Sequence, residues 1–170
     1  MVARSIPSRD ELFDILDEVK DPEVPVISVV ELGIVRDAEA SDAGVTVTIT
    51  PTYSGCPAMR EIEDEIRAAL EDRGLGPVRI RTTYTPAWTS DWITAKAREK
   101  LEAYGIAPPG PAREADGGSG LVTLRRASTV RCPYCKSTNT EQKSVFGSTA
   151  CKAIWVCREC RQPFEEFKAI

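Results

Sequence analysis

Four cysteines near the C-terminus constrain the possible structures of this chain more than any other feature. They form two CxxC pairs, Cys132 with Cys135 and Cys157 with Cys160, separated by 21 residues. Two such pairs can point four thiolates at one metal, which is the ligand set of a tetrahedral Zn²⁺ site. Residues 129–170 are too few to fold on a hydrophobic core alone, so we predict a zinc ribbon nucleated by its metal. Iron held by the same thiolates and two chance CxxC turns with free thiols are the alternatives.

Composition and charge narrow the class of protein. The 170 residues are 42% hydrophobic and 28% charged, which is typical of globular domains. No apolar run approaches the roughly 20 residues that a membrane-spanning helix needs, and the first residues lack the apolar segment of a secretory signal. We therefore expect a cytoplasmic protein without a membrane partner, in which the cysteines stay reduced and bind metal.

The distribution of charge and the absence of histidine exclude several functions. Residues 129–170 carry a net charge of +3 and the rest of the chain carries −7. An acidic main body argues against nucleic acid as a partner. The chain contains no histidine, which excludes catalytic mechanisms that need imidazole and zinc sites that use it.

Hydrophobic periodicity predicts an α+β domain before the ribbon. Ser8 and Glu11 form a capping box that opens a helix reaching about Val19. Strict alternation over residues 45–50 predicts a strand with one buried face. The remaining expected elements are a strand over 34–39, a helix over 57–73, a strand over 78–84 and a helix from a cap at Thr89-Ser90-Asp91 to about Tyr104. The order α-β-β-α-β-α predicts a small mixed sheet with packed helices.

Glycine, proline and charge become dense after this domain. The stretch Asp116-Gly117-Gly118-Ser119-Gly120 has the composition of a flexible linker. We therefore place the domains at 1–105 and 129–170, joined by a linker over 106–128.

Cys56 is the second candidate site. It lies in the turn Gly55-Cys56-Pro57, before the helix expected over 57–73. Because proline suits the first helical position, Cys56 is expected at or near the N-cap, where the helix dipole lowers the pKa of a thiol. Gly55 would let the backbone approach a ligand closely. On these grounds Cys56 should react with alkylating agents faster than the other cysteines. A buried cysteine that acts as a small hydrophobic residue is the alternative.

Three further features carry weaker signals. The loop Asp21-Pro22-Glu23 offers two carboxylates for a metal or a basic partner, although such loops are usually only solvated. Trp88 and Trp92 are core residues in the favoured interpretation and anchors for a partner in the other. Cys151 is not needed by a four-thiolate site, and packing in the ribbon core is favoured over a role as a secondary thiol or in a contact with a partner.

Together these residues resemble a known family. The N-terminal part is similar to the SufT-like metal–sulfur cluster assembly domain through Asp21-Pro22-Glu23, the Gly55-Cys56-Pro57 turn and Thr52 upstream of it. The whole chain resembles the PaaD-like proteins, which are encoded with phenylacetyl-CoA epoxidase. The stretches that carry this likeness are DPEVPVISVVELGIVRD, TPTYSGCPAM, YTPAWTSDWI, RCPYC, FGSTACKA and CRECRQPFEEFK.

The resemblance implies an accessory protein for phenylacetate degradation that is not an enzyme by itself. Cys56, Asp21, Glu23 and Thr52 would help to place an iron–sulfur cluster or iron in a subunit of the epoxidase. The reductase subunit with its iron–sulfur cluster is the expected client, and the di-iron subunit is the second choice. The main alternative is a structural subunit of the oxygenase complex; a homodimer stays open. An enzyme that uses Cys56 as a nucleophile ranks lower because it lacks a histidine base.

Overall fold

The computed structural model describes residues 6–111 and 129–170, and the contacts between residues divide the chain into two compact units. The first comprises residues 1–88 and 92–97, and the second comprises residues 89–91 and 98–170. The predicted linker lies mostly outside the described residues, so the domain boundaries stay a prediction. None of the described helices is long and apolar enough to cross a membrane.

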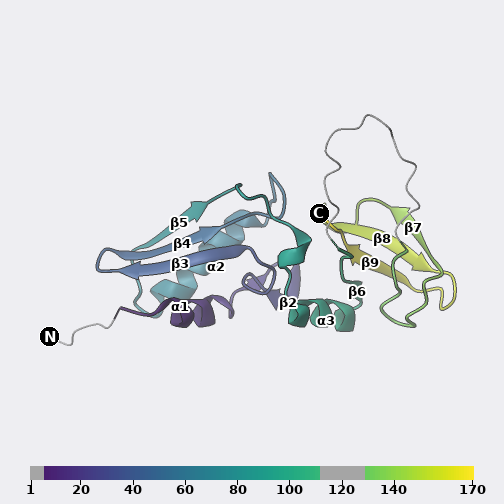
Figure 1. Cartoon of the computed structure of the whole chain (residues 1–170), viewed down its shortest axis with the longest axis horizontal. Helices are drawn as coiled ribbons and strands as arrows, with labels where there is room; N and C mark the ends of the chain where they lie inside the picture. Colours follow the sequence, from purple (N-terminus) through teal and green to yellow (C-terminus); the bar gives the residue numbers. More distant parts are fainter. Residues whose placement is uncertain (1–5, 112–128) are drawn as a thin grey trace. The chain divides into compact units, whose positions relative to one another are not determined.

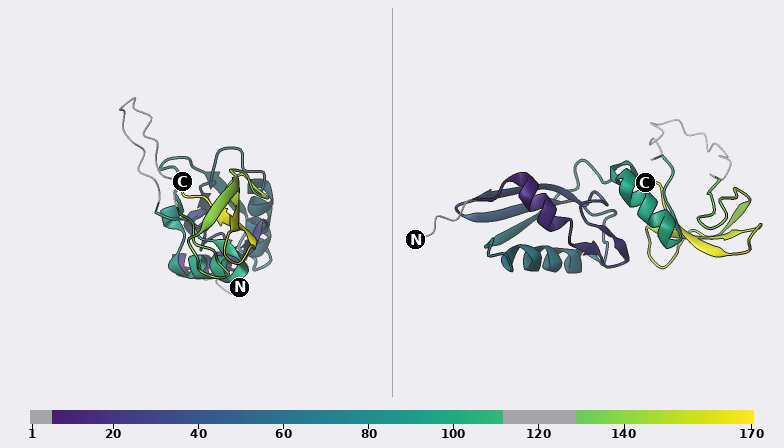
Figure 2. Two further views of the ribbon diagram at one scale, coloured as in Figure 1. Left: turned by 90° about the vertical axis from the view of Figure 1, so that its right-hand side faces the viewer. Right: turned by 90° about the horizontal axis from the view of Figure 1, so that it is seen from below.

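The first unit is built on a three-stranded sheet with two helices packed against it. Figure 1 labels all of these elements except the short β1, and Figure 2 shows them from two further sides. In chain order they are α1 (Arg9–Leu16), β1 (Lys20–Asp21), β2 (Val24–Ser28), β3 (Val35–Ser41), β4 (Gly44–Ile49), α2 (Met59–Glu71) and β5 (Val78–Thr82). The α+β class, the mixed sheet and the element order are confirmed, with the short β1–β2 pair added.

The sheet has the order β3-β4-β5, with β3 antiparallel and β5 parallel to β4. The predicted alternation of β4 is confirmed, because Val45, Val47 and Ile49 are buried while Thr46 and Thr48 are half-buried. The buried residues of the helices complete this core; they are Leu12 and Leu16 of α1 and Ile62, Ile66 and Leu70 of α2.

The predicted capping box of α1 is confirmed. Ser8 accepts a hydrogen bond from the backbone N–H of Glu11, and the Glu11 side chain accepts one from the backbone N–H of Ser8. The helix ends at Leu16, earlier than the expected Val19.

The expected cap at Thr89-Ser90-Asp91 is wrong, because Ser90–Trp92 forms a 3-10 turn, η1. Helix α3 starts later and spans Ala95–Tyr104, with the Thr94 hydroxyl accepting from the backbone N–H of Ala97.

The second unit contains most of α3 and a four-stranded sheet. Its strands are β6 (Ile106–Ala107), β7 (Thr140–Ser144), β8 (Lys152–Cys157) and β9 (Pro163–Phe167), in the order β6-β9-β8-β7. Strand β6 falls in the stretch predicted as linker and pairs in parallel with β9. The sheet packs a small core of Ala107, Val130, Ala153, Trp155 and Phe164 with Cys132 and Cys157. Two metal-ligand candidates are thus part of the core itself.

Candidate metal-handling sites

The turn after β4 carries Cys56. Gly55 has a φ of +89°, a left-handed conformation that favours glycine. Nothing lies within 4 Å of where its Cβ would be, so the backbone angle rather than a close approach explains the glycine. The N–H of Cys56 donates to the carbonyl of Tyr53 at 3.4 Å, and its own carbonyl accepts from Met59 at 3.3 Å. Cys56 therefore sits inside a closed turn that precedes α2.

Cys56 was expected at or near the N-cap of α2, and it lies near the cap but not at it. The helix begins at Met59 and its N-cap is Ala58, which makes no side-chain capping bond. Two residues separate the thiol from the first turn of the helix, where the dipole acts most strongly. The local sequence suggested otherwise because proline is common at the first helical position, but Pro57 lies before the cap.

The expected lowering of the Cys56 pKa is wrong. Burial raises the pKa of this half-buried thiol, because it removes water from the thiolate. The backbone N–H of Ala58 and the side chain of Tyr53 act in the opposite direction. The carboxylates of Glu23 and Asp21 raise the pKa further by charge repulsion.

The carboxylates of Glu23 and Asp21, more than 30 residues earlier in the chain, act on the Cys56 thiol through space. Thiolate and carboxylate are both iron ligands, but these three side chains do not form a ready ligand cluster: among the described residues only the four CxxC cysteines bring their ligand atoms close enough to share one ion. Binding a cation would reverse the electrostatics, because the carboxylates that disfavour a free thiolate would stabilise the metal beside it.

Asp21 also holds the loop in shape. Its Oδ1 accepts hydrogen bonds from the backbone N–H groups of Glu23 at 2.9 Å and Val24 at 2.8 Å, and the residue is buried. Glu23 is half-buried. Thr52 is buried in the Cys56 turn, and the buried hydroxyl of Thr50 at the start of that turn has no hydrogen-bond partner among the described residues. No sequence pattern pointed to the contributions of Tyr53 and of the Ala58 N–H.

Alkylation of Cys56 tests the raised pKa. We expect slow modification at pH 7 and faster modification as the pH rises, because the thiolate is the reacting form. Glu23→Gln removes a charge that raises the Cys56 pKa, and we expect the rate at pH 7 to increase about twofold. Mass-resolved alkylation at several pH values measures both effects, with Glu65→Gln on α2 as the control. Equal rates for the Glu23→Gln variant and the native chain would contradict the electrostatic account.

That Cys56 reacts before Cys151 stays a prediction. It now rests on access to solvent rather than on pKa, since Cys56 is half-buried and Cys151 is 8% exposed. The Cys151 thiol lies 3.0 Å from the Thr149 hydroxyl.

The two tryptophans differ in their surroundings. Trp88 is buried and its Nε1 donates to the carbonyl of Leu32 at 3.1 Å. Trp92 is half-buried, and the Arg36 guanidinium lies 3.5 Å from the centre of its ring.

The second unit brings the four CxxC cysteines together. Their sulfur atoms all lie within 4.8 Å of one another. Cys132 Sγ is 3.7 Å from Cys160 Sγ, and Cys135 Sγ is 3.4 Å from Cys157 Sγ. A tetrahedron with Zn–S bonds of about 2.3 Å has sulfurs about 3.8 Å apart. Both of these contacts join one knuckle to the other, which is the arrangement expected around a single metal.

The two CxxC knuckles share one backbone geometry. Lys136 and Arg161, each directly after a CxxC, have φ values of 63° and 60°. The N–H of Cys132 donates to Ser137 and that of Cys157 donates to Gln162, at 2.9 and 3.0 Å. The sequence did not indicate these left-handed residues, because lysine and arginine seldom adopt that conformation.

The two thiols of the second knuckle differ. The backbone N–H of Cys160 and then that of Glu159 donate toward Cys157 and outweigh burial, which lowers the Cys157 pKa to about 7. The backbone N–H of Gln162 acts in the same direction on Cys160, but burial and the neighbouring thiols outweigh it and raise the Cys160 pKa to about 12. Without a metal the four thiols therefore hold one thiolate more readily than several, and a bound cation would favour deprotonation of the others.

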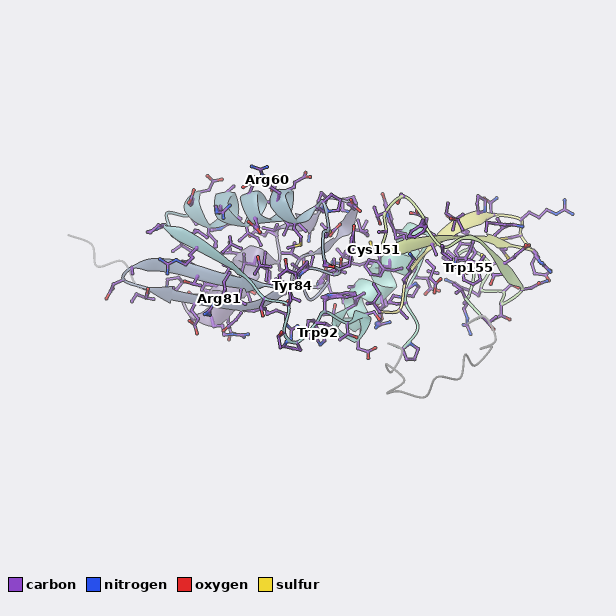
Figure 3. All side chains as sticks on the ribbon, turned by 90° about the horizontal axis from the view of Figure 1, so that it is seen from above. Arg60, Arg81, Tyr84, Trp92, Cys151 and Trp155 are labelled. Carbon is purple, nitrogen blue, oxygen red and sulfur yellow. The ribbon has the colours of Figure 1, made fainter. Side chains whose placement is uncertain are left out.

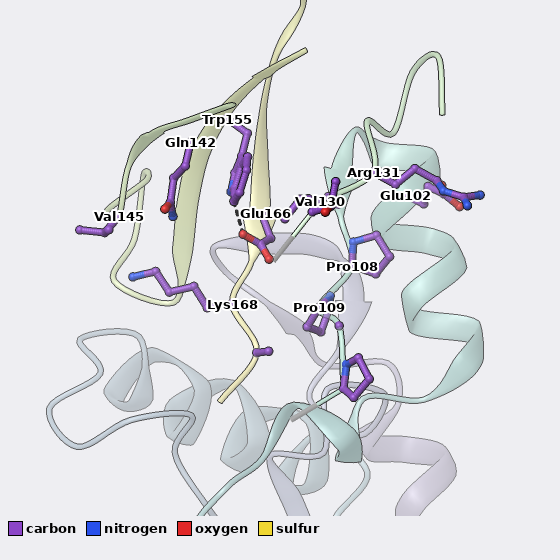
Figure 4. Close-up of a pocket in the computed structure, with 15 residues that line it drawn as sticks. Glu102, Pro108, Pro109, Val130, Arg131, Gln142, Val145, Trp155, Glu166 and Lys168 are labelled. Atoms are coloured by element: carbon purple, nitrogen blue, oxygen red, sulfur yellow. Dashed lines mark hydrogen bonds between the residues drawn. The ribbon is translucent and has the colours of Figure 1, made fainter. Parts of the chain in front are cut away.

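A cavity of about 600 Å³ lies elsewhere in the second unit (Figure 4). Pro108, Pro109, Val130 and Trp155 form much of its wall, and the Trp155 Nε1 donates to Glu166 at 2.7 Å. None of the four CxxC cysteines lines it, so the cavity and the metal cluster are separate features of this unit.

The fold of the first unit and the four-thiol cluster of the second define a cluster-assembly domain combined with a zinc ribbon. Residues 9–81 match the family described as iron-sulfur cluster assembly protein, and residues 117–168 match the PaaD zinc beta ribbon domain. The chain is 43% identical to an Escherichia coli (strain K12) protein, over 96% of this chain and 94% of that protein. That protein is provisionally named as one of the subunits of 1,2-phenylacetyl-CoA epoxidase. This chain belongs to the PaaD family, which confirms the resemblance inferred from the sequence.

Two further relatives concern the first unit. An Fe-S protein maturation auxiliary factor of Porphyromonas gingivalis (strain ATCC BAA-308 / W83) is 33% identical, over 56% of this chain and 92% of that protein. The crystal structure of a domain of unknown function, DUF59, from Bacillus anthracis matches with a TM-score of 0.51 and 25% identity. It covers 55% of this chain and 90% of the other, and so supports the fold of the cluster-assembly domain.

Proposed function

We propose that this protein assists the insertion of an iron–sulfur cluster or iron into a subunit of a phenylacetyl-CoA epoxidase. The observation that carries the proposal is the electrostatic effect of the Glu23 and Asp21 carboxylates on Cys56, in a unit that matches a cluster-assembly family. The names of the relatives support it, since one refers to an epoxidase subunit and another to maturation of Fe-S proteins.

The raised pKa of Cys56 suits a transient carrier better than a permanent metal site. A thiol that keeps its proton at neutral pH must lose it when iron binds, so protonation competes with the metal and favours release. The same property suits a covalent nucleophile poorly, because little thiolate is present and the chain contains no histidine to act as a base. We therefore infer an accessory role rather than catalysis by this chain.

The ribbon takes a different role in this proposal. Four thiolates within 4.8 Å of one another would fill all four positions of a tetrahedral ion, which is typical of a structural site. We propose Zn²⁺ as its metal, and colourless protein with one zinc per chain would support zinc over iron.

Iron and acid-labile sulfide in the epoxidase components test the transfer role. We expect the reductase from cells that carry Cys56→Ala to contain less than about a tenth of the normal iron and sulfide, as in deletion cells, because the transferring ligand is lost. Cys151→Ala is the matched control and should leave the metal content normal.

The structural-subunit alternative predicts a different result. Full metal content in both the deletion and the Cys56→Ala cells would reject the transfer role. If the deletion also prevented assembly of the complex while Cys56→Ala did not, the protein would be a structural subunit.

A further inference from the structure

Strand β5 forms an outer edge of the sheet in the first unit. Among the described strands it pairs only with β4, which lies beside it in Figure 1. The pairing is parallel and joins Thr46 to Arg79 and Thr48 to Arg81. No hydrogen bond from another described segment reaches the opposite side of β5. An edge strand of this kind presents backbone N–H and C=O groups that an added strand can use.

Strand β5 also carries two exposed arginines, Arg79 and Arg81. Arg79 and Arg81 alternate with Val78 and Ile80, so they share the face of Thr46 and Thr48 that turns away from the core. Both are exposed, and neither forms an ion pair within the described part of the chain. Three other described arginines of this unit do pair with a carboxylate, namely Arg9, Arg67 and Arg73.

The two exposed arginines without an ion pair lie in a unit whose net charge is negative. The first unit carries a net charge of −7, so spare carboxylates are abundant while the two arginines of β5 form no ion pair with any described one. Their side chains are spaced two residues apart on a strand, the spacing at which residues of an adjacent strand face them. Guanidinium groups bind carboxylates through two parallel hydrogen bonds, which lysine does not do.

We propose that the outer edge of β5 binds an extended acidic segment of a partner polypeptide, which joins the sheet as a further strand. Carboxylates at alternate positions of that segment would face Arg79 and Arg81. The surface and its partner do not depend on the chemistry of Cys56, and the proposal goes beyond the transfer function.

The observations favour a polypeptide over a nucleic acid. The edge of a strand offers both N–H and C=O groups, which another strand can pair in full, whereas phosphate oxygens can only accept from the N–H groups. Two arginines also neutralise few phosphates, whereas nucleic-acid binding proteins contact many of them. Charged residues on an edge can alternatively serve only to prevent aggregation, and this alternative predicts no binding.

Fluorescence anisotropy with synthetic peptides tests the proposal on the full chain. The probe is a labelled eight-residue peptide in which glutamate alternates with valine. Its matched controls replace glutamate by lysine or methylate alternate backbone nitrogens. The test variant carries both Arg79→Glu and Arg81→Glu. The charge-matched control carries both Arg60→Glu and Arg67→Glu on helix α2; Figure 3 labels Arg60.

We expect saturable binding of the glutamate peptide that weakens as salt is added. The double change on β5 should weaken binding at least about tenfold, since two attractive cross-strand pairs become repulsive. The change on α2 should have little effect, and backbone methylation should weaken binding although it leaves every charge in place.

Several results would overturn the proposal. These are no binding of the glutamate peptide at low salt, equal loss from the α2 variant, no effect of backbone methylation, or tighter binding of a single-stranded oligonucleotide. If the β5 variant failed to fold, the methylated peptide with the native chain would still decide between strand addition and simple charge attraction.

Discussion

Strong chelation is expected to unfold the ribbon and leave the first unit folded. Structural zinc sites of this kind contribute on the order of 10 kcal/mol to folding, and the ribbon core contains few large apolar side chains besides Trp155 and Phe164. Cys132 and Cys157 are fully buried in this core. Loss of the metal therefore breaks the metal–sulfur bonds and disturbs the packing of the core at the same time. Hydrogen exchange before and after chelation measures the effect.

In this experiment β7, β8 and β9 should lose protection while β3 and β4 keep theirs. Cys157→Ser should mimic chelation, and Cys151→Ser should retain both the metal and the protection. Persistent protection of β8 in metal-free protein would contradict a metal-dependent ribbon.

Asp21→Ala is expected to lower the free energy of unfolding of the first unit by about 2–4 kcal/mol. The substitution removes the acceptor of two backbone N–H groups, those of Glu23 and Val24, and leaves both inside a largely buried loop. Asp21→Asn should cost much less, because the amide oxygen can accept the same bonds. Urea unfolding, with hydrogen exchange in residues 24–49 as the readout for the first unit, measures the free energy of unfolding of both variants.

The pair of Asp21 variants also separates two roles of one side chain. If Asp21→Asn keeps the stability but lowers the iron and sulfide of the epoxidase components, the carboxylate charge contributes to metal handling. If Asp21→Asn keeps both the stability of the first unit and the metal content of the epoxidase components, Asp21 serves only to shape the loop. Equal losses of stability in the Ala and Asn variants would contradict the hydrogen-bonding account.

Local sequence signals predicted much of the fold because the features concerned, such as helix caps and strand pleats, are determined by residues close together in the chain. The capping box of Ser8 and Glu11 is closed by atoms three residues apart. The alternation of β4 follows from its pleat, which turns successive side chains to opposite faces. The helix over α2 was predicted, but its first residue was not, because Pro57 is compatible with a turn as well as with a helix start.

The Cys56 site shows where local reasoning fails. Its pKa depends on burial and on Glu23 and Asp21, which approach from a distant loop. The N–H of Ala58, at the start of α2, does lower the pKa, but burial outweighs it, so the error in sign came from desolvation that the local sequence does not encode.

The sequence by itself determined the four-cysteine metal site, because each CxxC encodes its own turn and four thiolates have one low-energy way to share a cation. It also determined the α+β class through hydrophobic periodicity. Only the tertiary structure decided the parallel pairing of β4 with β5, the free edge that carries Arg79 and Arg81, and the environment of Cys56. Strand pairing, desolvation and charge repulsion depend on distances through space, and a local pattern of residues does not encode those distances.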